Sequence, residues 1–156
     1  MSKLKNSDYG NINRLKIIMT KLRDPIKGCP WDIKQTYKTI APYTVEEAYE
    51  VADAIERGDT NDLKEELGDL LLQVVYLSQI AAEDNHFDFE DVVETISSKM
   101  VNRHPQVFNS DNNDNVRPDW EELKEKERKK KNPLSGVLEG VAITLPALVR
   151  AFKLQK

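Results

Sequence analysis

The sequence predicts an all-α protein, a helical bundle of four or more helices. Apolar residues recur three and four positions apart along several segments, and helix-capping signatures precede those segments. No segment shows the strict alternation of a half-buried strand. The 156 residues carry a formal net charge of −4 and 39% of them are hydrophobic, which is the composition of one globular domain.

The first helix is expected over residues 11–23, before the helix-breaking Pro25. Its apolar face consists of Ile12, Leu15, Met19 and Leu22. After a loop at residues 28–30, Asp32 and Gln35 have the form of a capping box. This box predicts a short helix that ends before Pro42.

A second capping signature, Thr44 with Glu47, predicts a helix over residues 45–57 that Gly58 terminates. The side expected to face the core consists of Val45, Ala48, Tyr49, Ala52 and Ile55, and the acids occupy the other side. The longest periodic stretch covers residues 62–83 and predicts the most regular helix. Its apolar stripe consists of Leu63, Leu67, Leu70, Leu71, Val74, Leu77 and Ala81.

A further helix is expected after Asp88, its cap, and before His104 and Pro105. The residues predicted to face inward are Val92, Val93, Ile96 and Met100. Residues 120–131 are a highly charged helix candidate. A last helix is expected to begin at Pro146.

Three regions are predicted from these elements. Residues 1–108 are expected to form the helical core. Residues 109–119 are rich in Asn and Asp and lack periodicity, so they are expected to be a flexible linker. Residues 120–156 are expected to form a C-terminal helical segment, either part of the same domain or the start of a longer continuation.

Composition and motifs exclude several classes of protein. The lone cysteine, Cys29, rules out a disulfide framework and a multi-cysteine metal site. The polar first ten residues and the lack of a long apolar stretch predict a cytoplasmic protein with no membrane partner. The acidic balance argues against binding to nucleic acid. Glycine-rich phosphate loops and nucleophile elbows are missing from the sequence, and one Glu-x-x-His motif, at residues 83–86, is too few for a helical di-iron site.

Acidic residues are concentrated between residues 46 and 69, where ten acids and two bases give a local charge of −8. Two clusters stand out, Glu46-Glu47-x-x-Glu50 and Glu66-x-x-Asp69. Residues three apart share a helical face, so each cluster directs two carboxylates the same way. If the two helices are antiparallel neighbours, four carboxylates converge. Such a cluster calls for a cation, and oxygen ligands suit Mg²⁺ or Mn²⁺.

Periodicity alone leaves an alternative for part of this set. Glu66 falls at the rim of its apolar stripe, which makes it partly buried. Glu47 and Glu50 fall opposite the apolar side of their helix, as in a solvated face, and Glu47 is also explained by the Thr44 capping box.

Basic and aromatic residues offer candidate substrate contacts, each with a structural alternative. Lys99 and Arg103 present two cations on one helical face, which suits a phosphate chain or simply the C-terminus of the helix. Trp31 is expected either to stack on a nucleobase or to cap the edge of the core. Trp120, near Lys124, is a docking anchor or a phosphate contact.

Four segments together resemble MazG-type nucleoside triphosphate pyrophosphohydrolases. They are GCPWD at residues 28–32, YTVEEAYE at 43–50, EELGDLL at 65–71 and RHPQVF at 103–108. The similarity extends over about residues 11–156. Paired EExxE and ExxD motifs with the CPWD loop form a specific combination, whereas either acidic motif alone is common in charged helices.

The resemblance implies an all-α bundle that assembles as a dimer or a dimer of dimers. It also implies Mg²⁺-dependent hydrolysis of an NTP or dNTP to the monophosphate and pyrophosphate, with Mn²⁺ as a substitute. The metal ligands implied by position are Glu47, Glu50, Glu66 and Asp69. The acids implied to support them or to orient the attacking water are Glu46 and Glu65.

The resemblance further implies which residues contact the nucleotide. Lys99 and Arg103 are implied to hold the phosphate chain, Trp31 and Asp32 to lie near the base, and Trp120 with Lys124 to close late on the substrate. A rival from another class is a non-catalytic helical interaction module with a solvated acidic face. A third hypothesis keeps the fold and shifts the substrate to nucleoside diphosphates or phosphoribosyl compounds.

Overall fold

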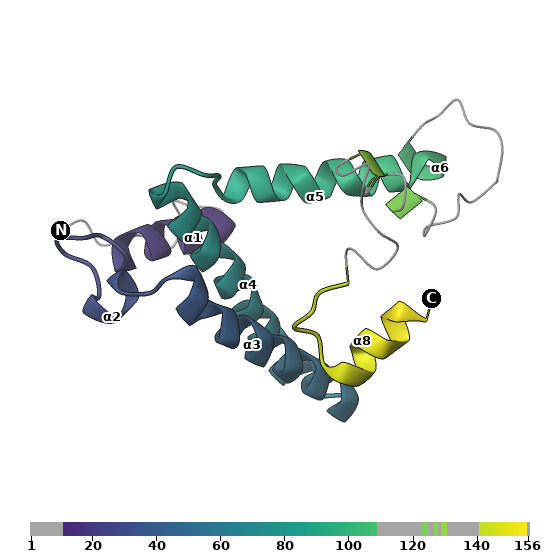
Figure 1. The fold of residues 1–156 in the computed structure, drawn as a ribbon. Helices are drawn as coiled ribbons and strands as arrows, with labels where there is room; N and C mark the ends of the chain where they lie inside the picture. The colour runs from purple at the N-terminus through teal and green to yellow at the C-terminus, as the bar shows by residue number, and fades with distance from the viewer. Residues whose placement is uncertain (1–10, 109–122, 125–126, 128, 131–140, 156) are drawn as a thin grey trace. The chain divides into compact units, whose positions relative to one another are not determined.

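The structure of the chain, a computed structural model, describes residues 11–108, 123–124, 127, 129–130 and 141–155 (Figure 1). Its elements are α1 (Asn11–Leu22), α2 (Pro30–Ile33), α3 (Tyr37–Arg57), α4 (Thr60–Glu83), α5 (Phe89–Arg103), α6 (Pro105–Phe108) and α8 (Ala147–Leu154). These described residues contain no strand, so the predicted all-α class is confirmed. The chain divides into two compact units, one ending at Ile96 and the other beginning at Ser97.

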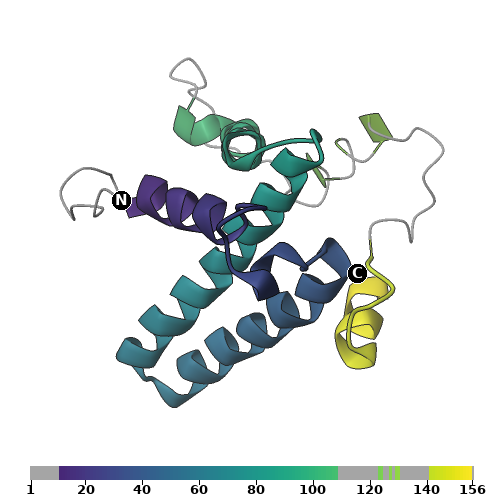
Figure 2. The ribbon, with the colours of Figure 1, turned by 90° about the vertical axis from the view of Figure 1, so that its left-hand side faces the viewer.

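The first unit is built on a hairpin of the two longest helices, α3 and α4, which lie side by side in opposite directions (Figure 2). Gly58 ends α3 with φ of 68°, a left-handed conformation that glycine adopts without strain. Asp59 then caps α4, because its Oδ1 accepts the amides of Asn61 at 3.0 Å and Asp62 at 3.1 Å. Two adjacent capping signals therefore reverse the chain within a few residues.

The core of this unit forms where α1 crosses the second half of α4. Its buried side chains are Met19, Ile40, Val75, Tyr76 and Ile80. Partly buried residues pack around them, namely Ile12, Leu15, Leu72, Leu77 and Phe89. The first half of α4 lies outside this core and is free to carry polar residues toward α3.

One boundary prediction was wrong. Residues 30–33 form the single turn α2, and α3 begins at Tyr37 and runs through Pro42 without a break. Thr36 and Thr39 form the capping box that starts α3, with a Thr36 amide to Thr39 Oγ1 distance of 2.8 Å. Pro42 is exposed in the second turn of α3. It has no amide hydrogen, so the helix loses the one hydrogen bond to the carbonyl oxygen of Lys38, which is also exposed.

The predicted inward faces of three helices were also wrong in whole or in part. Val45, Tyr49 and Ile55 of α3 are more than half exposed, whereas Ala54 is fully buried. The reason is that α3 turns its small and acidic side toward α4. On α4 itself, three members of the predicted stripe are exposed, Leu67, Leu71 and Val74, and α5 has no buried residue.

The remaining helices begin near the expected positions. Asp88 and Asp91 cap α5 reciprocally, each side chain accepting the other residue's amide at 3.0 Å. Helix α8 follows Pro146. The predicted linker 109–119 and most of residues 120–131 lie outside the described residues. Among the described helices, none combines the length and the apolar character needed to span a bilayer.

Candidate metal and nucleotide site

Three carboxylates from the two hairpin helices converge. Glu47 comes from α3, and Glu66 and Asp69 come from adjacent turns of α4. One carboxylate oxygen from each lies within 4.8 Å of the others. Glu47 and Glu66 are partly buried and Asp69 is exposed, so the group is open to solvent on one side.

Glu50 and Gln73 extend this carboxylate cluster along the hairpin. Glu50 lies one turn after Glu47 on α3 and acts electrostatically on both Glu47 and Glu66. Gln73 lies one turn after Asp69 on α4 and is buried, with its Nε2 3.3 Å from Oε1 of Glu47. The i, i+3, i+7 spacing of Glu66, Asp69 and Gln73 gives α4 a polar stripe facing α3.

Mutual repulsion is visible in the pKa values of the cluster. Burial first, and then the charge of Asp69, raises the pKa of Glu47 above its ordinary value. Burial and then the charge of Glu50 raise the pKa of Glu66 in the same way. For both acids, the charges of neighbouring carboxylates add to burial in disfavouring the ionised form.

The donor set fits a hard divalent cation. The clustered ligand atoms are carboxylate oxygens on neighbouring helical turns, which is the chemistry that Mg²⁺ and Mn²⁺ bind. In the described part of the chain, no lysine or arginine forms an ion pair with Glu47, Glu66 or Asp69. Arg57, at the hairpin tip, is engaged by Asp53 and Asp62 instead.

Two further predicted acids flank the cluster. Glu46 and Glu65 are both exposed. The charge of Glu65 contributes to the raised pKa of Glu66, so it lies within electrostatic range. The structure thus brings together Glu47, Glu66 and Asp69, with Glu50 close by, and leaves Glu46 and Glu65 on the surface next to them.

Comparison with known proteins agrees with this geometry. A family model described as MazG nucleotide pyrophosphohydrolase domain matches residues 35–108. A nucleoside triphosphate pyrophosphohydrolase of Escherichia coli K12 is 52% identical over 148 residues, which are 93% of this chain and 56% of that protein. The crystal structure of a mazG-related protein from Thermotoga maritima is 31% identical with a TM-score of 0.55, covering 76% of this chain and 98% of that chain. The chain belongs to the MazG family.

A second MazG relative also extends well beyond the region that it shares with this chain. The nucleoside triphosphate pyrophosphohydrolase/pyrophosphatase MazG of Thermotoga maritima is 43% identical over 139 residues, which are 89% of this chain and 53% of that protein. This chain therefore spans about half the length of these two curated relatives.

The CPWD segment of this MazG chain places an aromatic pair near the carboxylates. Trp31, on α2, is 52% exposed, and its ring meets that of Tyr43 edge-on, with centroids 6.2 Å apart and planes at 71°. Tyr43 precedes Glu47 by one turn of α3. Tyr43 was missed by the sequence analysis, although its i, i+4 relation to Glu47 was the available signal.

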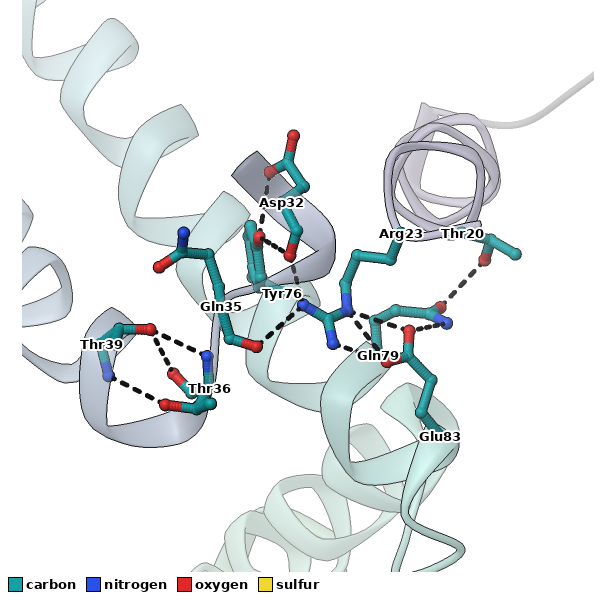
Figure 3. A network of polar contacts seen from close by, with 9 residues as sticks. All are labelled: Thr20, Arg23, Asp32, Gln35, Thr36, Thr39, Tyr76, Gln79 and Glu83. Carbon is teal, nitrogen blue, oxygen red and sulfur yellow. Dashed lines mark hydrogen bonds and ion pairs between the residues drawn. The ribbon is translucent and has the colours of Figure 1, made fainter. Parts of the chain in front are cut away.

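Asp32 lies inside the first unit. It is 9% exposed, and its Oδ1 accepts a hydrogen bond from the Tyr76 hydroxyl at 2.9 Å (Figure 3). Its neighbour Trp31 is the exposed member of the CPWD segment. The aspartate is thus built into the support of this segment.

The predicted phosphate-binding cations belong to the second unit. Lys99 and Arg103 lie four residues apart on α5. Arg103 is engaged by Glu127, with an Nε–Oε1 distance of 3.0 Å. Lys124 is partly buried, and Trp120 lies outside the described residues.

Proposed function

We propose that this MazG chain is a Mg²⁺-dependent nucleoside triphosphate pyrophosphohydrolase. The reaction would convert an NTP or dNTP and water into the monophosphate and pyrophosphate. The observation that carries the proposal is the convergence of carboxylate oxygens from Glu47, Glu66 and Asp69 within 4.8 Å. The activities for which the Escherichia coli and Thermotoga maritima relatives are named support the reaction class.

The proposed metal ligands are Glu47, Glu50, Glu66 and Asp69, with Mn²⁺ able to replace Mg²⁺. When bound, the metal supplies Lewis acidity, which neutralises phosphate charge and lowers the pKa of water. Gln73 holds the Glu47 carboxylate from the buried side. Glu46 and Glu65 are proposed to support the ligands or to orient the attacking water.

The proposed substrate contacts extend from the base to the phosphates. Trp31 and Tyr43 are proposed to receive the base, since exposed aromatic rings stack on nucleobases. Lys99 and Arg103 are proposed to neutralise charge that develops on the leaving pyrophosphate. Trp120 and Lys124 are proposed to make a late-closing contact.

The spacing between the aromatic pair and the carboxylates supports one site of bond cleavage. Side chains one helical turn apart are separated by about 5 to 6 Å between β-carbons, and this is the relation of Tyr43 to Glu47. We expect a base seated on the aromatic pair to bring the α-phosphate nearest to the proposed metal ligands. This favours attack at the α-phosphorus and release of pyrophosphate.

Product analysis by phosphorus NMR tests the proposal. A panel of NTPs and dNTPs is incubated with Mg²⁺ and the parent chain, Glu50→Gln, or Asp53→Asn. Asp53 is the matched control, because it lies on α3 and pairs with Arg57 at 2.7 Å. We expect monophosphate and pyrophosphate from the parent and Asp53→Asn, and neither from Glu50→Gln. Full Mg²⁺-dependent turnover by Glu50→Gln would reject its role as a ligand.

A non-catalytic interaction module is the second candidate, favoured by the exposed apolar residues of α3 and α4. The two functions differ in their response to metal. A ligand that binds the folded state alone raises the melting temperature. Millimolar Mg²⁺ should therefore stabilise the proposed enzyme, and an interaction module with a solvated acidic face should show no such gain. No turnover combined with no stabilisation would favour the module.

A further inference from the structure

We propose that Arg23 is a positioning residue for the aromatic pair Trp31–Tyr43. Its guanidinium fixes the single turn α2, and α2 in turn presents Trp31 against Tyr43. The inference rests on the proposed function, which assigns the pair to the base of the nucleotide. Arg23 itself touches no part of this assigned base contact and acts through α2.

Helix α2 needs support from outside itself. Four residues are too few for a helix to be stable alone, because nucleation is costly and few hydrogen bonds repay it. Cys29, at its N-cap, makes no side-chain capping bond. The position of Trp31 therefore depends on tertiary contacts to this turn.

Arg23 supplies those contacts at the C-terminal end of α2 (Figure 3). It is 9% exposed, and its Nη1 donates to the carbonyl oxygen of Asp32 at 2.7 Å and to that of Gln35 at 3.2 Å. Carbonyls at the end of a helix lack partners within the helix, so a cation there satisfies them and also complements the helix dipole. One nitrogen thus holds both the end of α2, at Asp32, and Gln35, the residue that follows its C-cap.

The other side of the guanidinium is anchored on α4. Nε donates to both carboxylate oxygens of Glu83, at 2.9 and 3.0 Å, and Nη2 donates to Oε2 at 2.6 Å. The ring of Tyr76 lies 5.5 Å from the Arg23 guanidinium carbon. A planar fork held at both sides has one orientation, which a lysine ammonium cannot reproduce.

Tyr76 makes a second contact to the same turn. Its hydroxyl lies 3.0 Å from the carbonyl oxygen of Asp32 and 2.9 Å from Oδ1 of the same residue. Asp32 directly follows Trp31, so the backbone that carries the indole is tied to Arg23 and Tyr76 together. Both Tyr76 and Glu83 belong to α4, the helix that also carries Glu66 and Asp69. The network therefore connects α2, which carries Trp31, to α4, the helix that carries two of the clustered carboxylates.

Substitution of Arg23 by lysine tests the proposal, because it keeps the charge and removes the fork. Trp31 fluorescence is measured in a Trp120→Phe background, since the chain has two tryptophans. We expect Arg23→Lys to increase acrylamide quenching of Trp31. In the chain with Trp120 intact, we expect KM for the NTP to rise about tenfold, the equivalent of a weakened base stack, with kcat within about twofold.

Lys16→Met is the matched control, because Lys16 pairs with Glu90 and lies over Phe89, away from α2. It should alter neither Trp31 quenching nor KM. If folded Arg23→Lys has the quenching and KM of its parent, the positioning role is wrong and the network only stabilises the fold. If no protein turns over nucleotide, the proposed function fails, while the quenching result still decides whether Arg23 holds Trp31.

Hydrogen exchange on the unsubstituted chain keeps the proposal testable should Arg23→Lys fail to fold. The amides of Ile33, Lys34 and Gln35 donate to carbonyls of α2 and its cap at 3.0 to 3.2 Å. With Arg23 clamping this turn, they should exchange as slowly as amides within α3. Exchange at the rate of an unstructured loop would overturn the proposal.

Discussion

Gln73 of α4 donates a hydrogen bond from its Nε2 to Oε1 of Glu47 on α3, and the two atoms are 3.3 Å apart. Gln73 is 7% exposed, so this amide meets the carboxylate cluster from its buried side. The contact orients Glu47 while the opposite side of the cluster stays open to solvent. Outer hydrogen bonds of this kind set the direction of a metal-binding carboxylate.

Replacing Gln73 by leucine should weaken metal binding. The substitution keeps the volume roughly constant and removes the donor to Glu47, so the carboxylate loses its orientation. We expect the affinity for Mg²⁺ or Mn²⁺ to fall about 10- to 100-fold, measured by isothermal titration calorimetry. Gln79→Leu is the control, since Gln79 lies on α4 and bonds Thr20 and Glu83 instead. Equal affinities for the two variants would contradict this role of Gln73.

The fold class and most helix boundaries could be predicted because their signals are local. Gly58 and Asp88, for example, act through the backbone of their own turns. The start of α3 was predicted wrongly, because the capping signatures at Asp32 and Thr44 match the usual sequence pattern, whereas the cap that forms uses Thr36 and Thr39. An exposed Pro42 does not stop a helix whose first turn is already capped.

Replacing Glu66 by glutamine should relieve repulsion within the cluster. Without metal at neutral pH, Glu66→Gln should melt at a higher temperature than the parent, because one of the crowded charges is gone. Adding Mg²⁺ should stabilise the parent and leave the variant almost unchanged. Differential scanning calorimetry with and without Mg²⁺ measures both effects. A parent that is already the more stable protein without metal would contradict the repulsion.

The same variant gives a prediction for pH. The pKa of Glu66 is raised in the folded chain above its ordinary value of 4.5. The folded state then binds this proton more tightly than the unfolded state, so the cost of the charge is complete above the raised pKa and disappears as pH falls toward 4.5. The advantage of Glu66→Gln in melting temperature should shrink over that window. An advantage independent of pH would mean that the charge is not its source.

Two glycines should respond to alanine with opposite signs. A β-carbon at Gly28 would overlap the backbone oxygens of Leu22 and Asp24, so Gly28→Ala should lower the free energy of unfolding by about 1–3 kcal/mol. Gly68 lies within α4, and a β-carbon there meets nothing within 4 Å. Gly68→Ala should therefore raise stability by about 0.5–1 kcal/mol. Urea unfolding of both variants checks the signs.

The candidate site could be predicted only in part. The acidic motifs could be predicted because i, i+3 spacing fixes which side chains share a helical face. The side of α3 that meets α4 could not be predicted. An apolar face at Val45 and Tyr49 would ordinarily turn inward, but in this helix Glu47 faces α4 instead. The contact between Trp31 and Tyr43 was out of reach because it depends on Arg23 and Glu83, which are 60 residues apart in sequence.

The exposed stripe of α4, formed by Leu67, Leu71 and Val74, should be the contact through which two copies associate. These residues are 37–49% exposed and lie four and three positions apart, so they form one apolar line on the helix. A symmetric dimer buries the same patch on both copies. A charge at Leu71 would therefore enter the interface twice, without a partner on either side.

We expect Leu71→Glu to weaken dimerisation about a hundredfold or more, because burying an unpaired carboxylate costs about 3 kcal/mol or more. Sedimentation equilibrium over a range of protein concentrations measures the change, and circular dichroism checks that the variant folds. Ile26→Glu is the control, since Ile26 is 87% exposed in the loop that follows α1 and is not part of the stripe. A parent that stays monomeric would reject the dimer. A Leu71→Glu chain that dimerises as the parent does would assign the interface to another face.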